Sequence, residues 1–243
     1  LPLDIEDWRE DPRFVALAGL MRRERGSVVL PHDEEPPPAR LAIIPRATYR
    51  LQFSGGFTFR QATELAPYLA ELGVSHAYTS PILTALPGSI HGYDVIDPTR
   101  INPELGGDDG LRHFVSELRG VGLGLIVDIV PNHMAVGASE NPWWADVLRN
   151  GPESEYAGYF DIDWHTSQPG LRNKLLAPFL GRPYGEALAD GELRLNQDHH
   201  GRSVVDYFGN QYPIRPQDEA HIQEAGLESF NPANQSGRDL LHA

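Results

Sequence analysis

The chain has 243 residues, 40% of them hydrophobic, with 34 acidic residues against 20 basic ones and no cysteine. A disulfide framework, a thiolate zinc site and a thiol nucleophile are therefore excluded, and the net charge of −14 argues against nucleic acid and anionic membranes as partners. No apolar run approaches the ~18 residues of a membrane span and no signal-peptide pattern opens the chain, so we expect a cytoplasmic protein.

Residues 1–30 predict a short helical piece, and residues 31–45 predict a Pro-rich, acidic linker. Asp11 can cap a helix whose first residue is Pro12, and four apolar residues then share one face: Phe14, Leu17, Ala18 and Met21. Three consecutive prolines favour an extended linker, where we place a domain boundary. The chain begins with Leu1 rather than Met, so we expect it to be part of a longer sequence.

Residues 46–134 alternate between strand and helix patterns. Strands are expected at residues 48–53, 74–80 and 123–130. The first intervening helix starts with a Thr58–Gln61 capping box and should kink at Pro67. The second opens at Asp108 or Asp109 and places four apolar residues on one face: Leu111, Phe114, Val115 and Leu118. This alternation predicts an α/β fold, either the start of a (β/α) barrel or a doubly wound sheet.

Two polar clusters stand about 30 residues apart in the sequence. Residues 123–134 read as a fully buried strand that ends in Asp128, Asn132 and His133. About 30 residues earlier, the spacing that a crossover connection needs, stands the segment His-Gly-Tyr-Asp at positions 91–94. Ligands gather at the carboxyl ends of parallel strands, so we expect both clusters to lie at one edge of the sheet.

Residues 135–243 predict an irregular subdomain. This region is rich in Gly, Pro, Asn and aromatic residues and has few periodic stretches. A small hairpin is expected where residues 193–195 and 203–208 flank a turn at 198–201. His199 and His200 beside Asp198 fit a solvated turn better than a metal site, because no third ligand has suitable spacing.

These motifs carry a family resemblance. Asp-Ile-Val-Pro-Asn-His at 128–133 and His-Gly-Tyr-Asp at 91–94 resemble segments of the α-amylase superfamily. With Ala-Thr-Tyr-Arg-Leu-Gln-Phe at 47–53, Asn-Pro-Trp-Trp at 141–144 and Leu-Gly-Arg-Pro-Tyr-Gly at 180–185, residues 46–243 resemble the amino-terminal part of the maltooligosyltrehalose synthase family. More weakly, residues 1–27 resemble the carboxyl-terminal end of an amylomaltase-type 4-α-glucanotransferase, and a generic capped helix explains them equally well.

The resemblance implies a fold and a reaction. The fold is a partial (β/α)8 TIM barrel, its first three strands at residues 46–134, with the irregular subdomain of residues 135–243 inserted after strand 3. The reaction is an intramolecular transglucosylation that converts the terminal α-1,4 linkage of maltooligosaccharides into the α,α-1,1 linkage of trehalose, through a retaining covalent intermediate.

The catalytic residues implied by the family are not found in this chain. A retaining enzyme needs two carboxyl groups about 5 Å apart. In this superfamily they follow later barrel strands, and no Gly-x-Arg-x-Asp segment occurs before Ala243. We therefore expect no catalytic residue here, no activity from this chain alone, and a need for the remainder of the barrel.

The resemblance instead implies six substrate-binding residues: His91, Tyr93, Asp94, Asp128, Asn132 and His133. Tyr93 would stack on the transferred glucosyl unit, His91 and His133 would hydrogen-bond its hydroxyls, and Asn132 would orient the loop. Without the surrounding motifs, Tyr93 and the two histidines would be expected to have structural roles. For Asp128, a structural role and a role in substrate binding are equally well supported. We expect no cofactor and no metal, although calcium-dependent relatives bind calcium through the residue that matches Asn132.

Three alternatives remain open. The chain could belong to an α-amylase-type hydrolase, to a 4-α-glucanotransferase, or to a non-catalytic α-glucan-binding remnant. Trp143, Trp144 and Trp164 could line a glucan groove, but the small core of the irregular subdomain is the better explanation for them.

Overall fold

The structure is a computed structural model that describes residues 44–137 and 140–242. The chain forms two compact units, the first ending at Ala135 and the second beginning at Val136, called unit 1 and unit 2 below. The helix expected within residues 1–30 and nearly all of the linker lie outside the described residues.

Unit 1 is built on a parallel sheet. Its strands β1 (Thr48–Leu51), β2 (His76–Thr79) and β5 (Gly124–Val127) pair in the order β1-β2-β5. The register places Arg50 opposite Tyr78, and Tyr78 opposite Ile126. Between the strands run α2 (Phe59–Glu64), α3 (Ala66–Glu71) and α4 (Gly107–Gly120), which confirms the predicted alternation of strands and helices.

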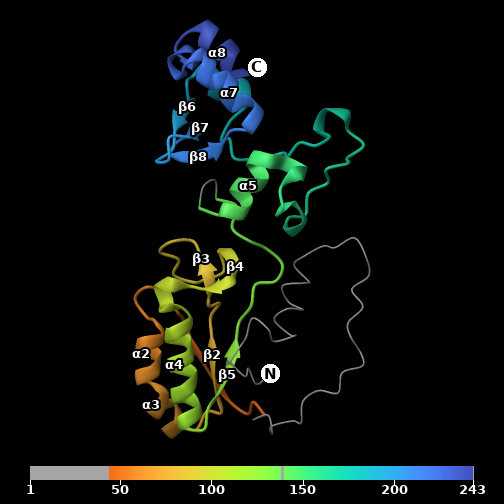
Figure 1. The fold of residues 1–243 in the computed structure, drawn as a ribbon. Coiled ribbons are helices and arrows are strands. Elements are labelled where there is room, and N and C mark those ends of the chain that lie inside the picture. The colour runs from red at the N-terminus through yellow and green to blue at the C-terminus, as the bar shows by residue number, and fades with distance from the viewer. Residues whose placement is uncertain (1–43, 138–139, 243) are drawn as a thin grey trace. The chain divides into compact units, whose positions relative to one another are not determined.

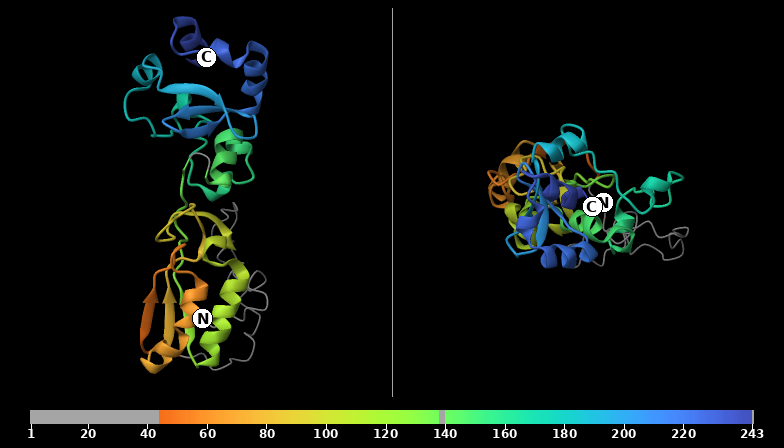
Figure 2. Two further views of the ribbon diagram at one scale, coloured as in Figure 1. Left: turned by 90° about the vertical axis from the view of Figure 1, so that its left-hand side faces the viewer. Right: turned by 90° about the horizontal axis from the view of Figure 1, so that it is seen from above.

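Helices α2, α3 and α4 lie against one face of this sheet (Figures 1 and 2). The core between the two layers is centred on three fully buried rings: Phe53, Phe59 and Phe114. The Phe53 centroid lies 5.0 Å from that of Phe59 and 6.0 Å from that of Phe114, in tilted and edge-on geometries that aromatic pairs favour. The four apolar residues predicted along one face of α4 are all buried in the same cluster.

Pro67 divides the first predicted helix into two helices, where the sequence analysis expected a single kinked one. The expected capping interaction is present, since the Thr58 backbone N–H donates to the Gln61 side-chain oxygen across 3.1 Å. The helix then ends at Glu64, and α3 begins with Pro67 in its first turn. Proline has no N–H to continue the α2 ladder but fits the start of a helix, so the segment divides in two.

Strand β5 is not fully buried, which corrects the prediction for residues 123–134. Its regular part covers only Gly124–Val127, and all four residues are half-buried. Leu125 and Val127 pack on the helical core, while Gly124 and Ile126 alternate onto the opposite face, where the described residues place no second layer. The continuous apolar run had indicated cover on both faces, but the described part of the chain covers only the helical face.

The sequence analysis did not predict the hairpin that lies between β2 and α4. Strands β3 (Leu83–Ala85) and β4 (Val95–Ile101) are antiparallel, with two shifts of register, and the 3-10 helix η1 (Pro103–Leu105) follows. Pro98 and the register shifts hide the period of two by which a strand is recognised. The loop between β3 and β4, residues 86–94, carries the His-Gly-Tyr-Asp segment.

Unit 2 is more regular than the sequence indicated. Its strands form an antiparallel sheet in the order β6-β7-β8: β6 (Leu193–Gln197), β7 (Ser203–Tyr207) and β8 (Asn210–Pro213). The predicted hairpin is confirmed, since the Asp198 N–H donates to the Arg202 carbonyl at the β6–β7 turn. The strands are too short, at four or five residues, for their alternation to stand out in the sequence.

The helices of unit 2 are short as well. The α-helices are α5 (Pro142–Asn150), α6 (Tyr184–Ala189), α7 (Pro216–Ala225) and α8 (Gln235–His242), and the 3-10 helices are η2 (Gly151–Glu153), η3 (Ala157–Tyr159), η4 (Pro169–Leu171) and η5 (Leu227–Phe230). Across the described part of the chain, no helix has both the length and the apolar character of a membrane span.

Two tryptophans of α5 pack against the following segment. Trp143 is buried, stacks on Tyr156 at 4.9 Å between ring centroids and meets Tyr159 edge-on at 4.6 Å. The Trp144 ring lies 5.0 Å from that of Phe160. These contacts support the small-core interpretation for Trp143 and Trp144, whereas Trp164 is half-buried.

Candidate functional site

The face of the parallel sheet opposite the helices presents polar side chains. Leu51, Ala77 and Leu125 belong to the helical core, so their neighbours along each strand alternate onto the other face. Those neighbours include Arg50 on β1 and Tyr78 on β2, and the same alternation brings Asp128 to this face just after β5. The Asp128 N–H still donates to the Thr79 carbonyl, so this residue remains tied to the sheet.

Tyr93 joins these strands through its hydroxyl group. The phenolic oxygen lies 2.5 Å from Oδ2 of Asp128 and 3.0 Å from Nη2 of Arg50, and Nη1 of Arg50 lies 3.2 Å from the same carboxylate oxygen. Because an ionised carboxylate can only accept, Tyr93 donates its proton to Asp128 and accepts from Arg50. The Arg50 guanidinium also lies over the Tyr78 ring, 4.6 Å from its centroid.

This network sets the charge of each group. Desolvation works to raise the pKa of Asp128, but the hydrogen bonds from Tyr93 and Arg50 outweigh it and lower the pKa below its ordinary value. The hydrogen bond to Asp128, with some desolvation, raises the pKa of Tyr93. Asp128 is therefore an anion and Tyr93 a neutral phenol near neutral pH, so this pair is suited to binding and orientation rather than to exchanging protons.

The histidines of both sequence clusters contact Tyr93 through its backbone. Nε2 of His133 lies 3.1 Å from the Tyr93 carbonyl oxygen, and Nδ1 of His91 accepts from the Tyr93 N–H across 3.1 Å. Nδ1 of His91 also lies 3.7 Å from Oδ1 of Asp94, which is too long for a hydrogen bond. Both histidines are exposed, as is Tyr93 at 37%, and the His91 ring lies 6.1 Å from the Tyr93 ring between centroids.

Asp94 closes the loop that carries Tyr93. Its Oδ1 accepts from the Ser89 hydroxyl across 2.5 Å, and the Ser89 oxygen accepts from the Gly92 N–H across 3.0 Å. Gly92 has φ = +75°, and a Cβ there would lie 2.6 Å from the Pro81 carbonyl oxygen, so glycine is required twice over. Asp94 thus fixes the shape of the β3–β4 loop. Asn132, the sixth predicted residue, is exposed and precedes His133 in the chain.

We call Arg50, Tyr93, Asp128 and His133 the Tyr93 cluster. It unites residues from both sequence motifs, although the motif at 91–94 lies in the loop of the antiparallel β3–β4 hairpin and not after a parallel strand. Sequence reasoning missed three contributors: Arg50, Tyr78 and Gln52, whose amide donates to the Ile90 and His91 carbonyls at 3.2 and 3.4 Å. The signal available was the Tyr-Arg-Leu-Gln segment at the end of the first predicted strand, where polar residues alternate with apolar ones. Among the described residues, no group of three or more His, Asp or Glu side chains is arranged to hold a metal ion.

Comparison with known proteins identifies the family. Residues 58–187, more than half of the chain, match the family described as alpha amylase, catalytic domain. A putative maltooligosyl trehalose synthase of Mycobacterium tuberculosis is 50% identical over 163 residues, which are 61% of this chain and 21% of that protein. An intracellular maltogenic amylase of Bacillus subtilis is 39% identical over 95 residues, covering 39% of this chain and 15% of that protein.

Solved structures agree with these matches. The maltooligosyltrehalose synthase from Arthrobacter ramosus aligns with a TM-score of 0.61 and 42% identity, over 71% of this chain and 21% of that one. The chain spans about a fifth of the length of the synthases it matches. Because the catalytic-domain match extends over more than half of the chain, this chain belongs to the alpha-amylase catalytic-domain family.

Proposed function

We propose that this chain is the amino-terminal portion of a maltooligosyltrehalose synthase and supplies the part of its active site that holds the transferred glucose. The observation that carries the proposal is the Tyr93 cluster. It gathers both predicted motifs at one edge of the sheet, in a chain 50% identical over 163 residues to a putative synthase of this kind. The three parallel strands would then open a (β/α)8 barrel, with unit 2 inserted before the fourth strand.

Each side chain has a role that its surroundings support. The Tyr93 ring would stack on the apolar face of a glucosyl unit, since the residue is exposed while its hydroxyl is fixed by Asp128 and Arg50. The exposed rings of His91 and His133 would donate to or accept from the sugar hydroxyls. Asn132 would hold the loop beside His133, and Asp94 would act through the loop it closes.

Arg50 would be a positioning residue. Its guanidinium touches the Tyr93 oxygen, the Asp128 carboxylate and the Tyr78 ring, so it fixes the ring plane without contacting the sugar itself. Planar guanidinium groups with several fixed donors suit this task better than a flexible ammonium. The cluster is thus organised before any substrate arrives, which lowers the entropic cost of binding.

The bond-breaking acids would lie in the remainder of the protein. A retaining mechanism needs one carboxylate as nucleophile and a second carboxyl group as acid and then base. Asp128 fits neither of these two roles, because its carboxylate already accepts hydrogen bonds from Tyr93 and Arg50, which lower its pKa. With glucose retained in the site and water excluded, the freed sugar can attack the intermediate and form the α,α-1,1 linkage. We therefore expect residues 1–243 alone to be inactive.

Product analysis on maltopentaose separates the candidate reactions. The whole protein should convert it, without change of mass, into a product that has lost its reducing end. A hydrolase would release shorter sugars that each keep a reducing end, and a 4-α-glucanotransferase would yield a ladder of shorter and longer reducing chains. Either result would reject the synthase assignment, and binding without turnover by the whole protein would favour a glucan-binding remnant.

A further inference from the structure

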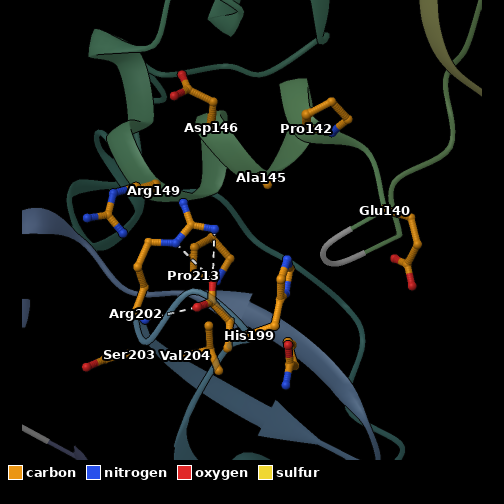
Figure 3. A pocket seen from close by; sticks show the side chains of 12 residues that line it. Glu140, Pro142, Ala145, Asp146, Arg149, His199, Arg202, Ser203, Val204 and Pro213 are labelled. Atoms are coloured by element: carbon orange, nitrogen blue, oxygen red, sulfur yellow. Dashed lines mark hydrogen bonds and ion pairs between the residues drawn. The ribbon is translucent and has the colours of Figure 1, made fainter.

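Unit 2 contains a hollow of about 400 Å³ that the Tyr93 cluster does not use. Helix α5 forms one wall, opposite strands β7 and β8 and the β6–β7 turn (Figure 3). Ala145 points from α5 toward these strands, and Asp146 and Arg149 also line the hollow. The volume lies in the range of small-molecule sites. All lining residues belong to unit 2, so the hollow is complete within one compact unit.

Both arginines that line the hollow form ion pairs with carboxylates. Arg149 lies 2.6 Å from a carboxylate oxygen of Glu219, and Arg202 contacts Asp198 through Nε at 2.9 Å and Nη2 at 2.8 Å. Asp198 also accepts backbone N–H groups of His200 and Arg202. Desolvation opposes ionisation of Asp198, but these bonds prevail and lower its pKa to about 2. The guanidinium groups are therefore held in place with their charge compensated.

The balance of charge argues against an ionic ligand. Asp146 is an additional carboxylate in the wall, and its two oxygens accept from Asn150 at 2.8 Å and from Ser154 at 2.5 Å. With Glu140, which also lines the hollow, and Glu219, the partner of Arg149, two arginines stand among four carboxylates, which disfavours a phosphate or another anion. The described residues form no group of acids and histidines suited to a metal ion. Asp146, Asp198 and Glu219 already accept hydrogen bonds from protein groups, so a neutral ligand fits the hollow better than an organic cation.

The remaining lining combines apolar patches with planar hydrogen-bonding groups. Ala145, Val204 and Pro213 supply apolar surface, while Gln211 and His199 present an amide and an imidazole. Each guanidinium has five N–H donors, more than its carboxylate partner occupies. A sugar ring has the complementary character, with apolar faces and a rim of hydroxyl groups.

We propose that this hollow is a second sugar-binding site, which takes one or two glucose units of an α-glucan chain. The neutral, polyhydroxylated character of the ligand follows from the lining, and its identity as an α-glucan rests on the proposed function. The site would bind a segment of the glucan independently of the Tyr93 cluster.

Titration calorimetry with maltotriose on the whole protein tests this, in a Tyr93→Ala background that disables the first site. Ala145→Trp fills the hollow from α5, and Ala189→Trp makes the same change at an exposed helical position elsewhere in unit 2. Gln211→Ala removes a hydrogen-bonding group from the lining, and Gln197→Ala is its control on β6. We expect residual maltotriose binding to weaken at least tenfold with Ala145→Trp and measurably with Gln211→Ala, with both controls unchanged.

Binding that both hollow variants leave unchanged would overturn the second site, as would inorganic phosphate that binds there in place of maltotriose. Should Ala145→Trp lower the melting temperature, Gln211→Ala decides alone. A failure of the proposed function is distinguishable, because it appears as maltotriose binding that Tyr93→Ala does not alter while the hollow variants still weaken it.

Discussion

Tyr93 and Asp128 are 35 positions apart in the sequence, yet the phenolic oxygen of one lies 2.5 Å from a carboxylate oxygen of the other. Tyr93 stands in the loop between β3 and β4, and Asp128 follows β5. The hydrogen bond therefore fixes a loop residue to the end of a sheet strand. This hydrogen bond restricts the rotation of the Tyr93 side chain, which a loop residue would otherwise have, and the exposed ring is held in one orientation.

The ring and the hydroxyl of Tyr93 should contribute separately. In the whole protein, Tyr93→Phe keeps the stacking surface but loses a charge-assisted hydrogen bond, so kcat/KM on maltopentaose should fall about tenfold. Tyr93→Ala removes the platform and should lower kcat/KM by about 100-fold or more. The melting temperature should change little in either variant. Equal losses from both substitutions, or a melting temperature that falls in step with activity, would indicate a structural role instead.

Asp128 should make stability depend on pH in the acid range. Its folded-state pKa is lowered from 3.8 because the bonds from Tyr93 and Arg50 outweigh desolvation. A lowered pKa gives stability that is fully present above the unfolded pKa and is lost as pH falls through the folded pKa. The free energy of unfolding should therefore decline less on acidification in Asp128→Asn than in the unsubstituted protein.

Arg50→Met provides the matching control for that titration. Without the guanidinium, the folded pKa of Asp128 should rise toward its unfolded value, so less stability should be lost on acidification and the loss should be complete at a higher pH. Urea unfolding between about pH 2 and 6 measures both effects, and identical pH profiles for all three proteins would contradict this description of the cluster.

Gly92 and Gly88 separate backbone strain from steric overlap within one loop. Both have positive φ, +75° and +74°, but a Cβ on Gly92 would lie 2.6 Å from the Pro81 carbonyl oxygen, whereas one on Gly88 would meet nothing within 4 Å. Gly88→Ala should cost about 1 kcal/mol of stability from strain alone. Gly92→Ala should cost an additional ~1–3 kcal/mol from overlap and weaken maltooligosaccharide binding. Equal effects in denaturant unfolding would show that overlap does not matter.

Gly124 lies in β5 where only glycine fits under the ring of His76. A Cβ there would overlap the Cδ2 and Nε2 atoms of that buried histidine. Gly124→Ala should therefore destabilise unit 1 by about 1–3 kcal/mol. Gly120→Ala is the control: it lies at the end of α4 with open space around its Cβ and should be neutral or stabilising by up to ~1 kcal/mol. A melting temperature unchanged by Gly124→Ala would refute the close packing of His76.

The elements with a strong local signal were predictable. Helix α4 follows from the spacing of its four buried residues, and the parallel strands follow from their alternation with helices. The β3–β4 hairpin was missed because Pro98 and shifts of register break the period of two. The antiparallel sheet of unit 2 was recognised only at the β6–β7 turn, where the turn residues are distinctive.

The candidate site was predictable in its motifs but not in its internal contacts. The rule that polar residues gather after parallel strands places Asp128 and His133, but Tyr93 reaches them from the loop of the β3–β4 hairpin, which the sequence analysis did not predict. The role of Arg50 required knowing that β1 pairs with β2 and that its side chain points away from the helices. Position 50 looks like an ordinary exposed strand residue in the sequence, because its partners Tyr93 and Asp128 are distant in the chain.

The most direct test of the central claim is a crystal structure of the whole protein with a bound maltooligosaccharide. We expect a glucosyl ring stacked on the face of Tyr93, with a sugar hydroxyl in hydrogen-bonding distance of the His133 imidazole. A sugar bound with its rings away from Tyr93, and with His133 in no contact with it, would contradict the assignment of this cluster to glucose binding.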